Sequence, residues 1–429
     1  MKKLGFLVLI AVSVNAVGQK PEGVFVYGDA LPDAPDLAPR GKYSIGVKTM
    51  ELVNKNQTDV LKRKDGVDPV YDRTLKVEVW YPSKVGDAQK DLISYDEVMG
   101  TYNDPKRPLI PFKFNGRANR DAALLKTDGK FPLIIVSHGY VGSRYIMSYL
   151  CENLASKGYV VVAIDHMEST FRDAAGFAST LLNRSKDVLF VLNQIADLGK
   201  AGSGSFLSGG VDADQTGLIG YSMGGYGVLN AAGAGYSDGS VKLFGVLAAG
   251  SDALKERTGS NPAYRATVDP RIKAVVAFAP WGMERGVWDA ESLKGLKVPT
   301  FFVAGSQDDI SGYEKGIKAI FDGAVSSDRF MLTYMNARHN VAPNPPPAES
   351  LAPGLPFDEY YRYAEPSWDQ RRLNNINQHF VTAFMGTYLK AQDNSEYLNL
   401  AVDSNEKTWK GFKGRSSTGM TLQQVKAVK

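Results

Sequence analysis

The sequence predicts an α/β protein with a doubly wound, mostly parallel sheet and an antiparallel hairpin at the N-terminal edge of that sheet. Three patterns carry this prediction: short runs that are apolar at every position, helix-like segments between those runs, and an alternating segment that precedes them. Runs that are apolar throughout indicate strands covered by helices on both faces. Strands that alternate with helices favour parallel pairing through right-handed crossovers.

Residues 1–16 are predicted to be a secretory signal peptide. Lys2 and Lys3 precede an apolar stretch, Leu4 to Val14, that is too short to span a bilayer as a helix. Ala16 suits the last position before a cleavage site, and a buried first strand or helix is the alternative. The pattern predicts an exported protein, periplasmic or secreted, and no later run has the length of a transmembrane segment.

The mature chain is expected to hold one domain behind a short extension. Residues 17–40 are rich in Pro, Gly and Asp and predict an extended arm, whereas residues 41–429 predict a single domain. Tyr43–Leu52 and Leu75–Tyr81 are predicted to form the edge hairpin, since the second of them alternates (LKVEVWY). Gly, Ser and Pro content and the spacing of the core strands predict insertions or loops near residues 200–215, 236–270 and 341–368.

The core elements are expected after residue 130. Strands are predicted at residues 132–136, 159–164, 217–219, 274–278, 300–303 and 330–334. Helices are predicted at residues 144–157, 181–198 and 223–234, with a final helix at about 369–392. A doubly wound sheet requires this alternation.

Composition and charge argue against several kinds of site. The formal net charge is +4 and the basic residues are scattered, whereas a nucleic-acid binder concentrates them in a patch. The one cysteine, Cys151, allows no intramolecular disulfide and is expected to be a buried, inert thiol. None of the four histidines is spaced with another His or Cys as zinc ligands are. We therefore expect no nucleic-acid partner, no metal and no organic cofactor, and the oligomeric state stays open.

Ser222 stands in Gly220-Tyr221-Ser222-Met223-Gly224, which matches the pattern G-x-S-x-G. Because Gly and Ser are common in this chain, the pattern alone is weak, and a glycine-rich turn with an incidental serine is the alternative. Its context is stronger, since a short apolar strand precedes it and a helix of small residues follows it. This strand–turn–helix is typical of the nucleophile elbow of the α/β-hydrolase fold. We therefore predict that fold, with Ser222 as the nucleophile.

His339 is the predicted base, because a serine hydroxyl needs a base within hydrogen-bond reach to become nucleophilic. It lies just after the last core strand, as the chain order Ser, acid, His of this fold requires. A lone surface histidine is the alternative. His166 precedes the elbow, and His379 lies in the last predicted helix, where packing or a hydrogen bond explains it.

An aspartate is expected to orient the base and stabilise its cation. Asp308 and Asp309 both follow the strand at residues 300–303, and either satisfies the chain order. A loop aspartate that only shapes a turn is the alternative.

Two backbone N–H groups are expected to bind the oxyanion of an acyl-transfer reaction. One belongs to Met223, after the nucleophile, and the other to Tyr140, in the loop after the first core strand. Gly139 permits the sharp turn of that loop, and His138 is expected to be a structural hydrogen-bonding residue. Trp281 follows the strand after the elbow, so we predict that it lines the substrate pocket; a tryptophan packed under the loop is the alternative.

At this point the chain resembles known families. The run SHGYVGSRYIMSYLCENLASKGYVVVAIDH resembles the plasma-type platelet-activating-factor acetylhydrolases and the dienelactone-hydrolase-like bacterial esterases. Later segments resemble bacterial cutinases and polyester hydrolases, at Pro280-Trp281, Val298-Pro299-Thr300 and His339 to Asn344. The acid of the acetylhydrolases comes from the loop that here reads Ala279-Pro280-Trp281, which has no carboxylate. Counted from Thr300, the resemblance to cutinases implies Asp308 as the acid, although their disulfide cysteines are missing here.

The resemblance implies an exported serine hydrolase of carboxylic esters that works through an acyl-enzyme on Ser222. Lipid-ester hydrolysis of the acetylhydrolase kind and polyester hydrolysis are alternatives, as is a peptidase or amidase. The substrate is then a small-molecule, lipid or polymer ester. A non-catalytic binding protein on a hydrolase scaffold is an alternative from another class.

Overall fold

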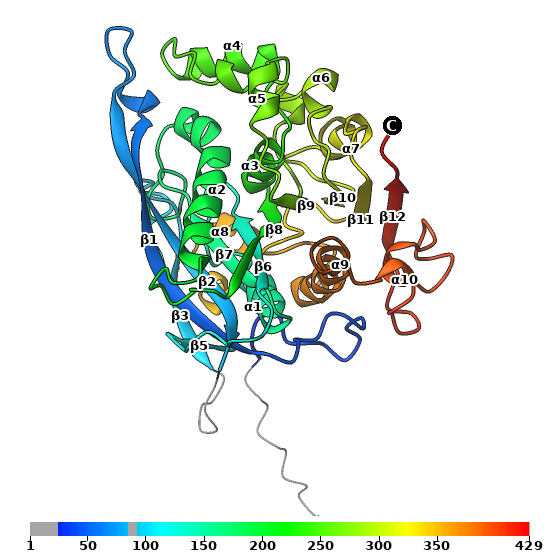
Figure 1. Ribbon diagram of the computed structural model, residues 1–429. Coiled ribbons are helices and arrows are strands. Elements are labelled where there is room, and N and C mark those ends of the chain that lie inside the picture. The colour runs from blue at the N-terminus through cyan, green and yellow to red at the C-terminus, as the bar shows by residue number, and fades with distance from the viewer. Residues whose placement is uncertain (1–24, 85–91, 429) are drawn as a thin grey trace, which may run out of the picture.

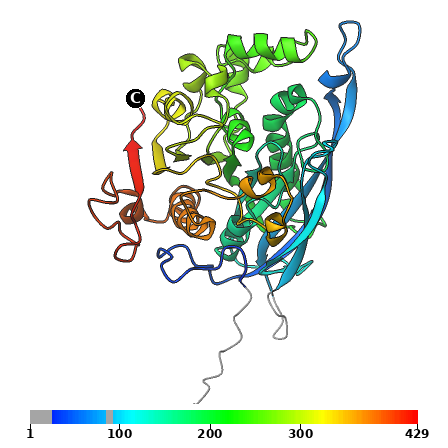
Figure 2. The same cartoon turned by 180° about the vertical axis from the view of Figure 1, so that it is seen from behind.

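The computed structural model describes residues 25–84 and 92–428 (Figure 1). The signal peptide predicted for residues 1–16 and the beginning of the predicted arm lie outside the described residues. Residues 25–40 contain no helix or strand and run below α9 (Gln370–Lys390), as Figure 2 also shows. The N–H of Leu31 donates to Asn375 Oδ1 (2.9 Å) and that of Leu37 to His379 Nδ1 (3.2 Å), so backbone hydrogen bonds fix the arm to this helix.

The centre of the described chain is a sheet in the order β12-β11-β10-β9-β8-β6-β7-β2-β1-β5. Within this sheet, the neighbouring strands β7, β6, β8, β9, β10 and β11 pair in parallel. β1 and β2 form an antiparallel hairpin, and β2 is antiparallel to β7. The predicted fold class is therefore confirmed. The bounds are β1 (Ser44–Thr58), β2 (Val70–Ser83), β5 (Ala118–Arg120), β6 (Phe131–Ser137), β7 (Val160–Asp165), β8 (Val211–Tyr221), β9 (Ile272–Phe278), β10 (Thr300–Gly305), β11 (Arg329–Tyr334) and β12 (Met420–Val425).

Some strands of the structure were not predicted from the runs of apolar residues. β5 lies outside the hairpin, in parallel with β1, so the hairpin is not the outermost element of the sheet. β3 (Ile93–Met99) and β4 (Ile110–Gly116) pair with each other apart from the main sheet. β8 begins at Val211, in a stretch predicted as loop, because its first half is polar and only its second half is buried on both faces. A search for continuous apolar runs finds just that second half.

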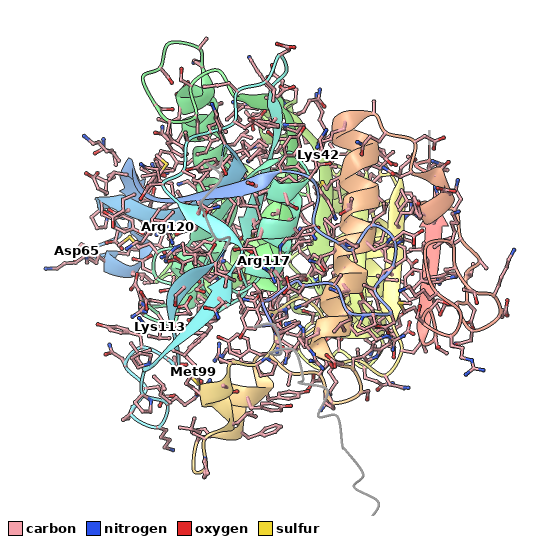
Figure 3. All side chains as sticks on the ribbon, turned by 90° about the horizontal axis from the view of Figure 1, so that it is seen from below. Lys42, Asp65, Met99, Lys113, Arg117 and Arg120 are labelled. Atoms are coloured by element: carbon pink, nitrogen blue, oxygen red, sulfur yellow. The ribbon has the colours of Figure 1, made fainter. Side chains whose placement is uncertain are left out.

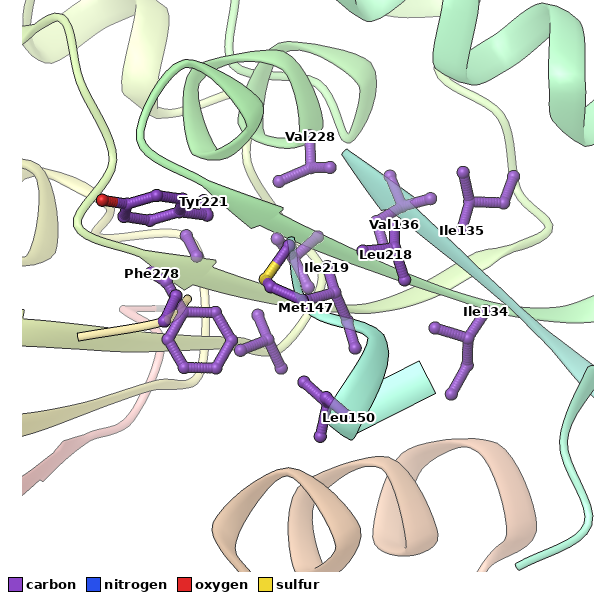
Figure 4. Packing of buried hydrophobic residues seen from close by; sticks show 14 of the residues in the cluster. Ile134, Ile135, Val136, Met147, Leu150, Leu218, Ile219, Tyr221, Val228 and Phe278 are labelled. Carbon is purple, nitrogen blue, oxygen red and sulfur yellow. The ribbon is translucent and has the colours of Figure 1, made fainter. Parts of the chain in front are cut away.

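Helices cover both faces of the sheet. α1 and α9 contact each other on one face, and α2 and α3 contact each other on the other. Figure 4 shows α3 above β8 and the other pair below it, with Leu218, Ile219 and Leu150 buried between them. No helix within the described ranges is long and apolar enough to cross a membrane. The helices are α1 (Ser148–Ser156), α2 (Phe177–Gly199), α3 (Met223–Ala231), α4 (Asp238–Leu247), α5 (Pro262–Ala266), α6 (Ala290–Leu293), α7 (Ala319–Gly323), α8 (Phe357–Tyr361), α9 and α10 (Ser395–Leu398).

The parallel strands bring four loops to one edge of the sheet. The loops after β6, β8, β10 and β11 contain Tyr140, Ser222, Asp308 and His339, respectively. The carboxyl ends of parallel strands meet at one edge, which is where sites form in open α/β sheets. The insertion predicted near residues 341–368 contributes α8 at the same edge, whereas the one near 236–270 forms α4 and α5.

Candidate active site

Ser222 forms the sharp turn between β8 and α3. Its φ of 54° and ψ of −113° lie where residues other than glycine seldom occur, and such strain persists only where the surroundings hold it. The Ser222 N–H donates to Phe278 O at 2.8 Å, and the Trp281 N–H donates to Ser222 O at 3.1 Å. Both peptide groups are thus tied to β9 and the loop after it; Tyr221 and Phe278 are labelled in Figure 4.

The glycines on either side of Ser222 are required by packing. A Cβ atom on Gly220 would collide with the carbonyl oxygen of Gly224. One on Gly224 would collide with the carbonyl oxygen of Ser137, at the end of β6. The G-x-S-x-G spacing therefore reflects the close approach of the first turn of α3 to β8 and β6.

Ser222, His339 and Asp308 form a continuous hydrogen-bonded chain. His339 Nε2 lies 2.9 Å from Ser222 Oγ, and His339 Nδ1 lies 2.9 Å from Asp308 Oδ2. Ser222 and His339 are each only 8 % exposed. The structure thus brings together the three residues predicted for nucleophile, base and acid, in the arrangement by which a base removes the hydroxyl proton.

Asp308 and Asp309 differ sharply in their surroundings. Asp308 Oδ1 accepts from the N–H groups of Ile310 (2.9 Å) and Ser311 (2.8 Å). Burial raises the pKa of Asp308, but the charge of His339 and these hydrogen bonds outweigh burial and bring it below its usual value. The carboxyl group is therefore ionised at neutral pH. Asp309 instead points to the surface, with its Oδ2 3.2 Å from Arg338 Nη2.

Glu365 holds the loop that carries His339, a role that the sequence analysis missed. Its buried carboxylate accepts from the N–H of Arg338 (2.7 Å) and from the N–H of Asn340 (2.6 Å), on either side of the histidine. The Tyr221 ring packs on the imidazole with centroids 5.3 Å apart. No local pattern marks Glu365, because its partners are backbone groups in a distant loop.

The loop after β6 is held by hydrogen bonds to ring nitrogens. His138 Nδ1 lies 2.6 Å from Gly139 O, and the His166 N–H donates to His138 Nε2 at 3.1 Å. Burial keeps the pKa of His138 well below its usual value, so the ring is neutral with its proton on Nδ1. In a trans peptide the C=O and N–H point in opposite directions. The N–H of Tyr140 therefore points away from His138.

Met223 and Tyr140, the two residues predicted as oxyanion donors, both lie close to Ser222. Met223 is the first residue of α3, where N–H groups have no acceptor within the helix and the helix dipole favours negative charge. Gly139 and Tyr140 line the same cavity as Ser222, and a Cβ on Gly139 would lie 3.3 Å from Ser222 Cβ. The segments that contain the two predicted donors thus both adjoin Ser222.

A second Ser–His–Asp set lies beneath the site. Ser137 Oγ is 2.8 Å from His166 Nε2, and His166 Nδ1 is 3.1 Å from Asp187 Oδ2. The guanidinium of Arg73 binds the same carboxylate at 2.9 Å. All of these side chains are buried, and burial lowers the pKa of His166 to about 3. Since no substrate can reach Ser137, this set is a structural network.

A cavity of about 300 Å³ opens beside Ser222 and His339. Loops after the parallel strands line it, together with the loop between β3 and β4 and the end of α8: Arg107, Gly139, Tyr140, Val141, Ile146, Tyr221, Ser222, Ile310, His339, Asn340, Asp358, Tyr361 and Arg362.

Trp281, which was predicted to line the pocket, is not among these residues. It is partly buried and packs edge-on against Phe177, which packs edge-on against Tyr140. Across residues 25–84 and 92–428, no three His, Cys, Asp or Glu side chains group as metal ligands.

Comparison with known proteins supports both resemblances seen in the sequence. Residues 113–189 match the family model of platelet-activating factor acetylhydrolase, isoform II. The chain is 24% identical over 220 residues to cutinase est1 of Thermobifida alba, covering 51% of this chain and 56% of that protein. It is 25% identical over 219 residues to bis(hydroxyethyl) terephthalate hydrolase of Streptomyces coelicolor, covering 51% and 53%. The chain thus spans about half the length of the curated relatives it matches.

A solved structure of ferulic acid esterase from Streptomyces cinnamoneus superposes with a TM-score of 0.54. The superposition covers 91% of this chain and 99% of the esterase at 18% identity, a likeness that concerns the fold. The similarity to α/β-hydrolase esterases inferred from the sequence is confirmed.

The contrast between the two aspartates can be tested through the reactivity of Ser222. Asp308→Asn should slow labelling of Ser222 by a fluorophosphonate by roughly 10⁴-fold, since the amide neither stabilises the imidazolium nor fixes the tautomer of His339. Asp309→Asn removes only an exposed ion pair and should change the rate by about tenfold at most. The measurement is the second-order labelling rate of each purified, folded variant. The opposite ranking would assign the acid to Asp309, and equal, small losses would place it elsewhere in the chain.

Proposed function

We propose that this α/β-hydrolase is a serine hydrolase that cleaves carboxylic esters through an acyl-enzyme on Ser222. The observation that carries the proposal is the chain of hydrogen bonds from Ser222 Oγ through His339 to Asp308 at the wall of a cavity. A binding protein on the same scaffold would have no need of all three residues in this geometry. The names of the relatives, cutinase and terephthalate hydrolase, favour esters over amides.

The proposed reaction proceeds in two halves. Ser222 Oγ attacks the ester carbonyl while His339 Nε2 takes its proton, and Asp308 stabilises the resulting imidazolium. The tetrahedral oxyanion accepts hydrogen bonds from the N–H groups of Met223 and Tyr140. When it collapses, the alcohol leaves with the proton from His339. A water molecule, deprotonated by the same nitrogen, then hydrolyses the acyl-enzyme and regenerates Ser222.

Lipid esters and polyesters remain candidate substrates of this reaction. The acetylhydrolase family match supports the first and the cutinase relatives support the second.

We also propose that the protein is exported, on the evidence of the signal peptide expected at residues 1–16. Sequencing the N-terminus of the mature protein should then begin at Val17, and a protein that begins at Met1 would contradict export by cleavage.

The serine can be tested against an internal control. Ser222→Ala should lower kcat for p-nitrophenyl acetate by at least about 10⁴-fold without unfolding the protein. Ser137→Ala is the matched control, because Ser137 has the same kind of hydrogen bond to a histidine but is fully buried. It should cost roughly 1 kcal/mol of stability and leave most of the activity. An active Ser222→Ala enzyme, or loss of activity in Ser137→Ala alone, would contradict the proposal.

We propose that Trp281 influences substrate selection through a row of three aromatic rings. Tyr140 lines the cavity, Phe177 packs against Tyr140, and Trp281 packs against Phe177. Its contact with Phe177, which in turn contacts Tyr140, supports a role for acyl groups that extend past the cavity. Trp281→Ala should then change the ratio of kcat/KM between long and short p-nitrophenyl esters by about tenfold. A variant with lower stability and an unchanged ratio would show that Trp281 only packs under its loop.

A further inference from the structure

Two arginines share the cavity with the catalytic serine and histidine. Arg107 lies in the loop between β3 and β4, and Arg362 directly follows α8. Neither position belongs to the alternating strands and helices that form the sheet. Figure 3 labels Met99, at the end of β3, next to α8, and a hydrogen bond from the Gly100 N–H to Glu359 Oε2 (2.8 Å) joins these two segments.

Arg362 is a cation without a carboxylate partner in the described part of the chain. Its Nη1 donates to Val141 O at 2.8 Å, and its guanidinium lies 5.2 Å from the centre of the Phe171 ring. Its Nε is buried, with no acceptor on the described residues. Burial lowers the pKa of Arg362, since removal from water disfavours the charged form. A partly buried charge without a counter-ion is costly unless a ligand supplies one.

Arg107 is already neutralised within the protein. Its Nε donates to Glu359 Oε1 at 2.6 Å, and Glu359 is buried. Its Nη1 lies 3.9 Å from Asp358 Oδ2, a side chain that is mostly exposed and therefore screened by water. Its Nη2, however, is buried without an acceptor on the described residues. The wall of the cavity thus holds one guanidinium without a carboxylate in ion-pair contact, that of Arg362, whereas the Nη2 of Arg107 is sealed from solvent and meets a ligand only if the side chain shifts.

Arg362 lines the cavity, and its Nη2 makes no hydrogen bond to the residues that the structure describes. Unlike the Nε of the same side chain, this nitrogen is not sealed from solvent, so it is the donor that a ligand can reach. A guanidinium fork matches the two oxygens of a carboxylate or phosphate, which accept several hydrogen bonds at once.

We propose that this cavity selects esters that carry a carboxylate or phosphate group, and that Arg362, assisted by Arg107, binds that anion while Ser222 attacks the ester bond. The inference rests on the proposed function, because it assigns a substrate class to the same site. The small volume of the cavity requires the anion and the ester bond to lie in one compact molecule or chain end.

The test compares pairs of esters that differ in charge but little in size. One pair is p-nitrophenyl hemisuccinate and its methyl ester, with the anion on the acyl side. Another is p-carboxyphenyl acetate and its methyl ester, with the anion on the alcohol side, and p-nitrophenyl phosphonopropionate tests a phosphonate. The wild-type enzyme should show a kcat/KM about tenfold or more higher for the anionic member of at least one pair. A preference for carboxylate over phosphonate, or the reverse, identifies the anion.

Substitution of the arginines should remove this preference. Arg362→Gln should lower the ratio of anionic to neutral kcat/KM by roughly 10- to 100-fold, the range expected for a lost charge-assisted hydrogen bond. The ratio is the readout, because loss of the bond to Val141 O also affects the loop of Tyr140. Arg107→Gln should lower the ratio less. Arg371→Gln is the matched control, since Arg371 is exposed, pairs with Asp369 and does not line the cavity.

Two results would overturn the inference. The first is hydrolysis of neutral esters with no preference for any anionic one, which leaves the proposed function intact. The second is a preference that is equal in the wild-type, Arg362→Gln and Arg371→Gln enzymes. If Arg362→Gln does not fold, the wild-type ratios and the Arg107→Gln ratio decide. Failure to hydrolyse any ester would overturn the proposed function together with the inference.

Discussion

The close approach of the first turn of α3 to the ends of β8 and β6 is the constraint on which the site depends. Gly220 and Gly224 permit it, and Ser222 spans the turn with a φ of 54°. The turn places Ser222 directly before Met223, the first residue of α3. Because Gly224 packs on the carbonyl of Ser137, any shift of β6 relative to β8 would move Ser222.

Below the turn, a buried network adds side-chain contacts to the backbone pairing that holds β6 between β7 and β8. Ser137 is hydrogen bonded to His166 at the end of β7, His166 to Asp187 on α2, and Asp187 to Arg73 on β2. Buried ion pairs add little net stability, but removal of one partner leaves an uncompensated charge. The network thus joins three strands and a helix through buried side chains. The hydrogen bond from His166 to His138 extends the same restraint to the loop of Tyr140.

The sequence allowed prediction of the parts of the site that depend on the fold. Ser222 has a local pattern, and His339 and Asp308 follow from chain order, since parallel strands deliver their loops to one edge. Glu365, Arg107 and Arg362 could not be predicted, because they come from an insertion after β11 and from the β3–β4 loop, and their partners are distant in sequence. The resemblance to cutinases separated Asp308 from Asp309, a distinction that adjacent, identical side chains could not provide. Trp281 was expected at the pocket from its strand, but its side chain packs behind Phe177.

Detection of the acyl-enzyme is the most direct test of the proposed chemistry. It can be trapped by quenching a reaction with p-nitrophenyl acetate in acid and measured by mass spectrometry of the intact protein and its peptides. The result expected is one acetyl group on the peptide that contains Ser222, present in the wild-type protein and missing in Ser222→Ala. An acetyl group on another residue, or turnover in which Ser222 is never acylated, would contradict the central claim.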